Sequence, residues 1–122
     1  MVAYHAADLV WQTRIKATGQ DVGVECRPVR NLEMLEARLG DSAVRGLIVD
    51  LESAEVGLAL ITALRGAGGR DPEKQIRILA FGPHVAVELF EQARAAGADR
   101  VLARGAFDRN LGELIKTLDG AA

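Results

Sequence analysis

A few residues with reactive side chains directly follow apolar stretches of the sequence. Asp50 follows Leu47-Ile48-Val49, Arg104 follows Val101-Leu102-Ala103, and the two histidines are His5 and His84. Two histidines near two carboxylates could hold a transition metal. The chain has none of the close ligand spacings that mark such sites, so we expect no metal there, and the default for each histidine is a lone surface or loop residue.

Other motifs argue against catalysis. The stretch Gly66 to Gly69 follows a helical pattern instead of joining a strand to a helix, so it does not match a phosphate-binding loop. Cys26 has no acid or histidine spacing that would activate it, and it reads as a small buried apolar residue. Trp11 is either a core residue or an exposed binding anchor. Without a nucleophile–base pair, an acid pair or a cofactor fingerprint, we expect neither an enzyme nor a cofactor.

Size and charge narrow the function classes. The 122 residues suit one domain spanning 1–122, and 4% aromatics predict a core of aliphatic side chains. A net charge of −2 gives no basic field for a phosphate backbone, so we do not expect nucleic-acid binding. The chain has no apolar run of membrane-spanning length and no secretion signal, and its single cysteine cannot form an internal disulfide. We therefore expect a soluble cytoplasmic protein.

Apolar runs alternate with segments of helical period. We expect strands at 2–4, 22–28, 46–51, 76–81 and 100–103, and helices at 8–18, 32–39, 54–65 and 85–96, with a last helix bearing Leu111, Leu114, Ile115 and Leu118. Asp8, Asn31 and Ser53 are the predicted helix N-caps. Gly19, Gly40 and Gly97 are the predicted helix ends, and residues 66–72 a loop.

Strands joined by helical crossovers run parallel. The pattern predicts an α/β fold with one doubly wound five-stranded sheet, flavodoxin-like order 2-1-3-4-5, and helices on both faces. Ligands of such sheets sit beyond the carboxyl ends of the strands. The predicted pocket therefore comprises His5, Ala6, Asp8, Asp50, Glu52, Gly82, His84 and Arg104.

Two stretches carry a family resemblance. Leu47-Ile48-Val49-Asp50-Leu51 resembles the third strand of response-regulator receiver domains, which ends in the phospho-accepting aspartate. Residues 95–104, Ala-Ala-Gly-Ala-Asp-Arg-Val-Leu-Ala-Arg, resemble the exit of the family's fourth helix and its fifth strand, which ends in a lysine. The resemblance covers essentially the whole chain in element order. It makes Asp50 the candidate phospho-acceptor.

The resemblance implies a magnesium site that this sequence does not complete. In receivers, two acids after the first strand join the aspartate in binding Mg²⁺, which requires oxygen ligands. His5 and Ala6 stand at those positions, and the nearest acid is Asp8. We therefore expect only a weak Mg²⁺ site at Asp50 and Asp8, and Mg²⁺ is a cofactor only if the protein is phosphorylated.

The rest of the relay machinery also departs from the family. Arg104 replaces the lysine, Gly105 the following proline, Gly82 the hydroxyl residue of the fourth strand, and Val101 the aromatic of the fifth. The pattern resembles that of pseudo-receivers, which keep the scaffold and lose phosphotransfer. Without Mg²⁺ ligands, Asp50 is expected to be a structural acid in a bidentate ion pair with Arg104.

Two features of the pocket rim stay open. Glu52 is expected to be solvated, the alternative being that it repels phosphate. The Gly82-Pro83-His84 segment is either a shaped binding loop or a rigid turn.

Three functions compete. The favoured one is a stand-alone pseudo-receiver that acts in two-component signalling by protein–protein interaction. The alternatives are an atypical receiver phosphorylated on Asp50 in a phosphorelay, and a small-ligand-binding flavodoxin-like domain. The resemblance implies a signalling protein as partner, or a homodimer, on the face of helix 4, strand 5 and helix 5. That face would draw on Glu88, Glu91, Arg94, Arg100 and Lys116.

Overall fold

Five parallel strands form the centre of the computed structural model, which describes residues 1–66 and 71–120. The strands are β1 (Val2–His5), β2 (Cys26–Pro28), β3 (Gly46–Asp50), β4 (Arg77–Gly82) and β5 (Arg100–Ala103). Their order is β2-β1-β3-β4-β5, which confirms the predicted sheet. All five residues of β3 are buried, as expected for a central strand that is covered on both faces.

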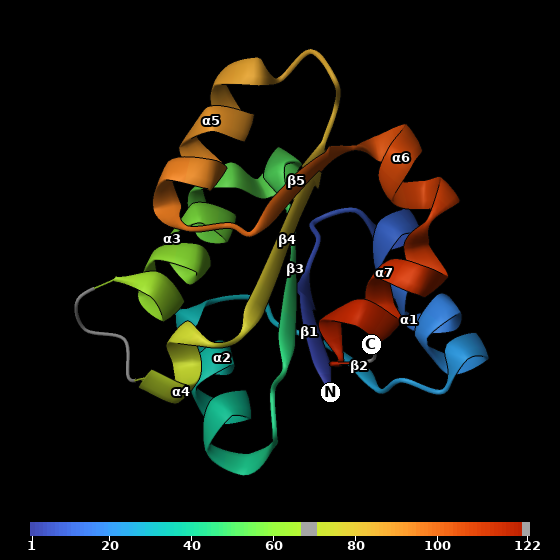
Figure 1. Ribbon diagram of the computed structural model, residues 1–122, viewed down its shortest axis with the longest axis vertical. Coiled ribbons are helices and arrows are strands. Elements are labelled where there is room, and N and C mark those ends of the chain that lie inside the picture. Colours follow the sequence, from blue (N-terminus) through green and yellow to red (C-terminus); the bar gives the residue numbers. More distant parts are fainter. Residues whose placement is uncertain (67–70, 121–122) are drawn as a thin grey trace.

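Helices cover both faces of the sheet (Figure 1). On one face lie α1 (Leu9–Val22), α7 (Leu111–Leu118) and the short α6 (Arg104–Arg109), which connects β5 to α7. On the other lie α2 (Leu32–Asp41), α3 (Ala54–Arg65) and α5 (Val87–Ala96). The one-turn helix α4 (Asp71–Lys74) leads into β4, and the 3-10 turn η1 (Leu51–Ser53) joins β3 to α3. No helix of the described residues is long and apolar enough to cross a membrane.

An aromatic cluster fills the space between the sheet and α1. The rings of Phe81 and Phe107 stack with their centroids 3.9 Å apart, and the indole of Trp11 meets Phe81 at 5.1 Å. Phe81 lies in the buried part of β4, and Phe107 lies on α6, so the cluster holds α6 against the sheet. Trp11 is therefore a core-packing residue, half-buried at the start of α1.

Two predicted helix ends were wrong. Helix α1 runs through Gly19 and ends at Val22, directly before Gly23, which adopts a left-handed φ of 77°. Gly19 is instead a contact point: a Cβ there would lie 2.6 Å from the Sγ atom of Cys26 and 2.8 Å from the carbonyl oxygen of Val24. Helix α2 likewise contains Gly40 and ends after Asp41. Gly97, in contrast, closes α5 with φ of 118°, as predicted.

The remaining differences are local. Strand β2 begins at Cys26, four residues later than predicted, because α1 occupies Val22. Helix α5 begins at Val87, two residues later than predicted. Part of the predicted loop 66–72 forms α4, while residues 67–70 lie outside the described residues. Helix α6 was not predicted, because its six residues carry too short a pattern to show a helical period.

Candidate functional site

The carboxyl ends of four strands bring most of the predicted site residues to one edge of the sheet. His5 ends β1 and is paired with Val49, and Asp50 ends β3 and is paired with Phe81. Gly82 ends β4 opposite Ala103, directly before Arg104. His5, Asp50 and Arg104 therefore lie at or directly after the carboxyl ends of β1, β3 and β5, the edge where such sheets bind ligands.

Asp50 is fully buried, with 0% of its surface exposed. Its Oδ1 atom accepts a hydrogen bond of 3.0 Å from the backbone N–H of Glu52, two residues on. Its Oδ2 atom is buried with no hydrogen-bond partner in the described part of the chain. Burial is the main cause that raises the pKa of Asp50, and the charge of Glu52 raises it further, against the lowering effects of the Glu52 N–H and of Arg104. The fold therefore disfavours an ionised Asp50.

Arg104 pairs with Glu52 and not with Asp50. One terminal nitrogen of its guanidinium lies 2.9 Å from Oε2 of Glu52, whereas Nε of Arg104 is buried with no hydrogen-bond partner among the described residues. The predicted Asp50–Arg104 ion pair was therefore wrong. Glu52 stays largely exposed to solvent, as expected, but it also pairs with Arg104. Glu52 is 53% exposed, so its carboxylate forms this pair without the desolvation that a second buried acid would suffer.

His5 is a buried residue, and the prediction of a surface histidine was wrong. Only 7% of it is exposed, its Nδ1 lies 2.7 Å from the carbonyl oxygen of Val29, and its Nε2 lies 3.0 Å from Oγ of Ser53. Ser53 was predicted only as the N-cap of α3, yet its side chain makes no capping bond. No sequence signal joined two residues 48 positions apart; the pairing of β1 with β3 brings them together.

The residues at the two expected magnesium positions do not suit that ion. His5 uses both ring nitrogens in hydrogen bonds, and Ala6 offers no side-chain ligand. Asp8 is exposed, and its Oδ1 accepts a hydrogen bond from Val10 N at 2.6 Å, which caps α1 as predicted. The negative charge of Asp8 raises the pKa of Asp50, but it is the weakest of the effects on that pKa. The described residues contain no group of three or more His, Cys, Asp or Glu side chains that could hold a metal.

Gly82 and His84 have different surroundings. Gly82 is buried, and a Cβ atom there would lie 3.2 Å from Cβ of Leu51 and 3.3 Å from Cε1 of Phe90. A larger residue would therefore have to push one of these neighbours aside. His84 is exposed on the turn before α5 and makes no hydrogen bond or ion pair within 1–66 and 71–120. The structure therefore shows no polar contact between His84 and the other residues of the predicted pocket.

Comparisons with solved structures give a consistent result. The chain superposes on a putative response regulator from Chloroflexus aurantiacus with a TM-score of 0.79 and 18% identity, over 96% of this chain and 94% of the other. Chemotaxis response regulator CheY4 of Vibrio cholerae gives 0.75 and 18%, over 96% of each chain. A response regulator from Burkholderia pseudomallei with a phosphorylated aspartic acid gives 0.71 and 20%, over 98% of this chain and 72% of that one. No family model and no curated protein matches the sequence.

The chain has the receiver-domain fold. Its predicted third and fifth strands and the exit of α5 take the places that the resemblance assigned to them.

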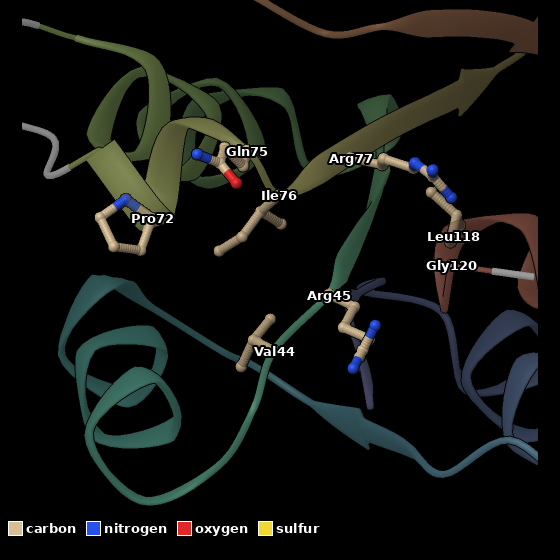
Figure 2. Close-up of a pocket in the computed structure, with 8 residues that line it drawn as sticks. All are labelled: Val44, Arg45, Pro72, Gln75, Ile76, Arg77, Leu118 and Gly120. Carbon is tan, nitrogen blue, oxygen red and sulfur yellow. The ribbon is translucent and has the colours of Figure 1, made fainter.

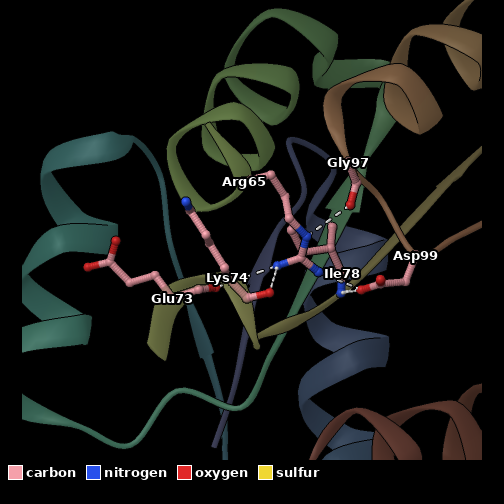
Figure 3. A network of polar contacts seen from close by, with 6 residues as sticks. All are labelled: Arg65, Glu73, Lys74, Ile78, Gly97 and Asp99. Carbon is pink, nitrogen blue, oxygen red and sulfur yellow. Dashed lines mark hydrogen bonds and ion pairs between the residues drawn. The ribbon is translucent and has the colours of Figure 1, made fainter. Parts of the chain in front are cut away.

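The receiver-like stretch before β5 has a physical role in the structure (Figure 3). Oδ2 of Asp99 accepts 2.7 Å hydrogen bonds from the backbone N–H of Ile78 and from the guanidinium of Arg65. Arg65 also donates to the carbonyl oxygens of Gly97 at 3.1 Å and of Lys74 at 2.9 Å. One half-buried arginine at the end of α3 thus joins α4, the start of β4 and the turn into β5. The aspartate of the motif is structural.

Two cavities lie at opposite edges of the sheet. One, of about 270 Å³, lies at the amino edge of the sheet, opposite the predicted site, and includes Arg45 and Arg77 in its wall (Figure 2). No residue of the predicted pocket lines it. The other, of about 230 Å³, lies beside β1 at the carboxyl edge. Its lining is Tyr4, His5, Ala6, Ala7, Gln12, Pro28, Val29 and Arg30.

Proposed function

We propose that this protein is a signalling module that binds partner proteins and does not use phosphotransfer at Asp50. The observation that carries the proposal is the state of His5. An imidazole with both nitrogens engaged in hydrogen bonds stands at a position where the receiver resemblance expects an oxygen ligand for Mg²⁺. A single carboxylate binds Mg²⁺ weakly, because that ion needs near-octahedral coordination by oxygen atoms.

The state of Asp50 supports the same proposal. A carboxylate attacks a phosphoryl donor in its ionised form, and burial with an unpartnered Oδ2 disfavours that form. The Glu52–Arg104 pair also engages the guanidinium at the rim of the pocket. A phosphoryl group on Asp50 would have to compete with Glu52 for that positive charge.

The alternative is an atypical receiver that is phosphorylated on Asp50. The Burkholderia pseudomallei structure holds a phosphorylated aspartic acid and a calcium ion, so this fold can carry such a group. For this chain to do the same, Arg104 would have to leave Glu52 and Asp8 would have to leave its cap on Val10. The Arg104–Glu52 ion pair and the Asp8 cap would both be lost in forming the phosphorylation site.

Exposed apolar side chains favour partner binding at the carboxyl edge. Leu9 and Val10 are 72% and 70% exposed, and Val85 and Val87 are 74% and 60% exposed. They stand on the segments that follow β1 and β4, so they flank the candidate site. Clustered exposed apolar residues are typical of protein interaction surfaces, whereas single ones carry no such meaning.

The face of α5, β5 and α7 is a second surface for a partner or a second copy. Its members Glu88, Glu91, Arg94 and Arg100 are exposed, and Lys116 is half-buried in an ion pair with Glu113. Strand β5 pairs only with β4 in the described residues, so its outer edge is unpaired. This face remains a proposal from the family resemblance, and its mixed charge does not select a partner.

The test is a titration with Mg²⁺ and beryllofluoride, which mimics an acyl phosphate, followed by NMR. We expect no shifts centred on Asp50 and Arg104. Fluorescence of Trp11, the only tryptophan, gives a second readout, because its indole contacts Phe81, the strand neighbour of Asp50. Saturable shifts that vanish in Asp50→Asn would establish the phosphorylated alternative.

The proposed binding surface is tested with the double variant Leu9→Asp, Val85→Asp. We expect it to lose a partner captured from the native cell while retaining the wild-type melting temperature, because both side chains are exposed. The matched control is the charge reversal Glu91→Lys on α5, which probes the alternative face. Loss of the partner with the control alone would move the interface to α5, β5 and α7.

A further inference from the structure

The His5–Ser53 contact has the geometry of a base and a nucleophile. The Val29 carbonyl oxygen can only accept a hydrogen bond, so the Nδ1 atom of His5, 2.7 Å away, must carry the proton. In the neutral ring Nε2 is then an acceptor. The hydroxyl of Ser53, 3.0 Å from Nε2, therefore donates its proton to the imidazole. A serine hydrogen-bonded to a histidine that a third group orients is the arrangement that activates a hydroxyl.

The backbone around Ser53 adds a second, independent observation. Ser53 is half-buried and lies where β3 passes through the η1 turn into the twelve-residue helix α3. Its side chain makes no capping bond to that helix. The first N–H groups of a helix lack acceptors within that helix, and the side chain of Ser53 does not cap them. Such donors stabilise an oxyanion that develops at an attacked carbonyl.

We propose that Ser53 is an acyl-acceptor site, with His5 as its general base and a small ester or thioester as the acyl donor. Oγ of Ser53 bonds to the carbonyl carbon, and its proton passes to Nε2 of His5. The bond from that carbon to the leaving alcohol or thiol breaks, and the leaving group takes the proton from His5. The products are an ester on Ser53 and the free alcohol or thiol, with no change in oxidation state.

The general base borders a cavity of about 230 Å³ beside β1, whose lining includes His5, Tyr4 and Pro28 but not Ser53. Ser53 itself is half-buried, so part of its surface is open to a small donor. An acyl group on Ser53 removes the donor that His5 Nε2 now accepts, so it breaks the only side-chain contact that His5 makes to the segment after β3. The modification would thus reach both β1 and the start of α3. The inference goes beyond the proposed function, because it adds a covalent input that does not involve Asp50.

The experiment uses the whole chain, p-nitrophenyl acetate as the acyl donor, and tandem mass spectrometry to locate the acetyl group. The chain has a built-in control: its only other serine is Ser42, whose hydroxyl donates to Asp41 at 2.7 Å on the surface. General-base assistance accelerates such reactions about 100-fold or more, so we expect Ser53 to be acetylated about 100 times faster than Ser42.

Two comparisons isolate the role of His5. In His5→Asn the amide can still donate to Val29 while the Nε2 base is gone, so the Ser53 rate should fall to that of Ser42. Unfolding the wild type in urea should have the same effect, which keeps the test decisive if the variant fails to fold. Equal rates at the two serines in the folded protein, or an unchanged rate in folded His5→Asn, would overturn the proposal. Either result leaves the beryllofluoride test of Asp50 unaffected.

Discussion

Replacing Asp50 by asparagine should stabilise the protein at neutral pH. The substitution keeps an acceptor for the N–H of Glu52 and replaces the unpartnered Oδ2 by a neutral amide nitrogen. A buried polar group without a partner costs about 1–3 kcal/mol, and a charged one costs more. Exchanging the charged orphan for a neutral one should therefore raise the free energy of unfolding by about 1–2 kcal/mol at pH 7, and the melting temperature by about 3–8 °C.

The pH dependence has a definite sign. The pKa of Asp50 is raised in the folded protein, chiefly by burial, so the folded state keeps this proton to a higher pH than the unfolded state does. The contribution of Asp50 to stability is therefore fully present below the unfolded value of about 3.9 and is lost as the pH rises through the folded value. The advantage of Asp50→Asn should be small at pH 4 and should grow toward neutral pH.

The assay is urea unfolding at several pH values, followed by circular dichroism. The matched control is Asp99→Asn, because Asp99 is an acid with two good partners, Arg65 and the N–H of Ile78, and its substitution should destabilise the fold. An Asp50→Asn variant that loses stability at pH 7 would refute the reasoning. That result would mean that Asp50 is ionised and paired with Arg104 in solution, as the sequence alone suggested.

Three further predictions concern the framework. Gly19→Ala should destabilise the fold by about 1–3 kcal/mol in thermal unfolding because of the contact with Cys26, whereas Gly40→Ala, also inside a helix but with open space around it, should stabilise by about 0.5–1 kcal/mol. Burial raises the pKa of the Cys26 thiol to about 11, so a thiol reagent at pH 8 should modify it at least about 100-fold more slowly in the native protein than in denaturant. Arg65→Lys should lower the melting temperature, since one ammonium cannot serve Asp99, Gly97 and Lys74 together.

Strand order and the positions of most elements could be predicted, because apolar runs and helical periods are properties of local sequence. Helix ends were harder to predict. Gly19 looked like a helix end because glycine often ends helices, but at this position the lack of a side chain allows β2 to approach α1. The sequence shows only that a glycine is present. The packing shows whether that glycine ends a helix or allows another element to approach closely.

The polar contacts of the site were predicted less well than the fold. Asp50 and Arg104 do reach the same edge, as the parallel topology required. Which acid Arg104 would choose depended on desolvation: Glu52 stays 53% exposed and can pair at little cost, while Asp50 is fully buried and satisfied on one oxygen by the next turn. A sequence gives no direct measure of that difference in exposure.

His5 does more at this edge of the sheet than occupy a position where the resemblance expects an acid. Its imidazole bonds to the segments after β2 and β3, at Val29 and Ser53. An ionised carboxylate can only accept hydrogen bonds, so an acid at this position could not donate to the Val29 carbonyl oxygen. The two bonds of His5 therefore connect β1 to the segments that follow both of its neighbouring strands, which favours the fixed binding surface that we propose.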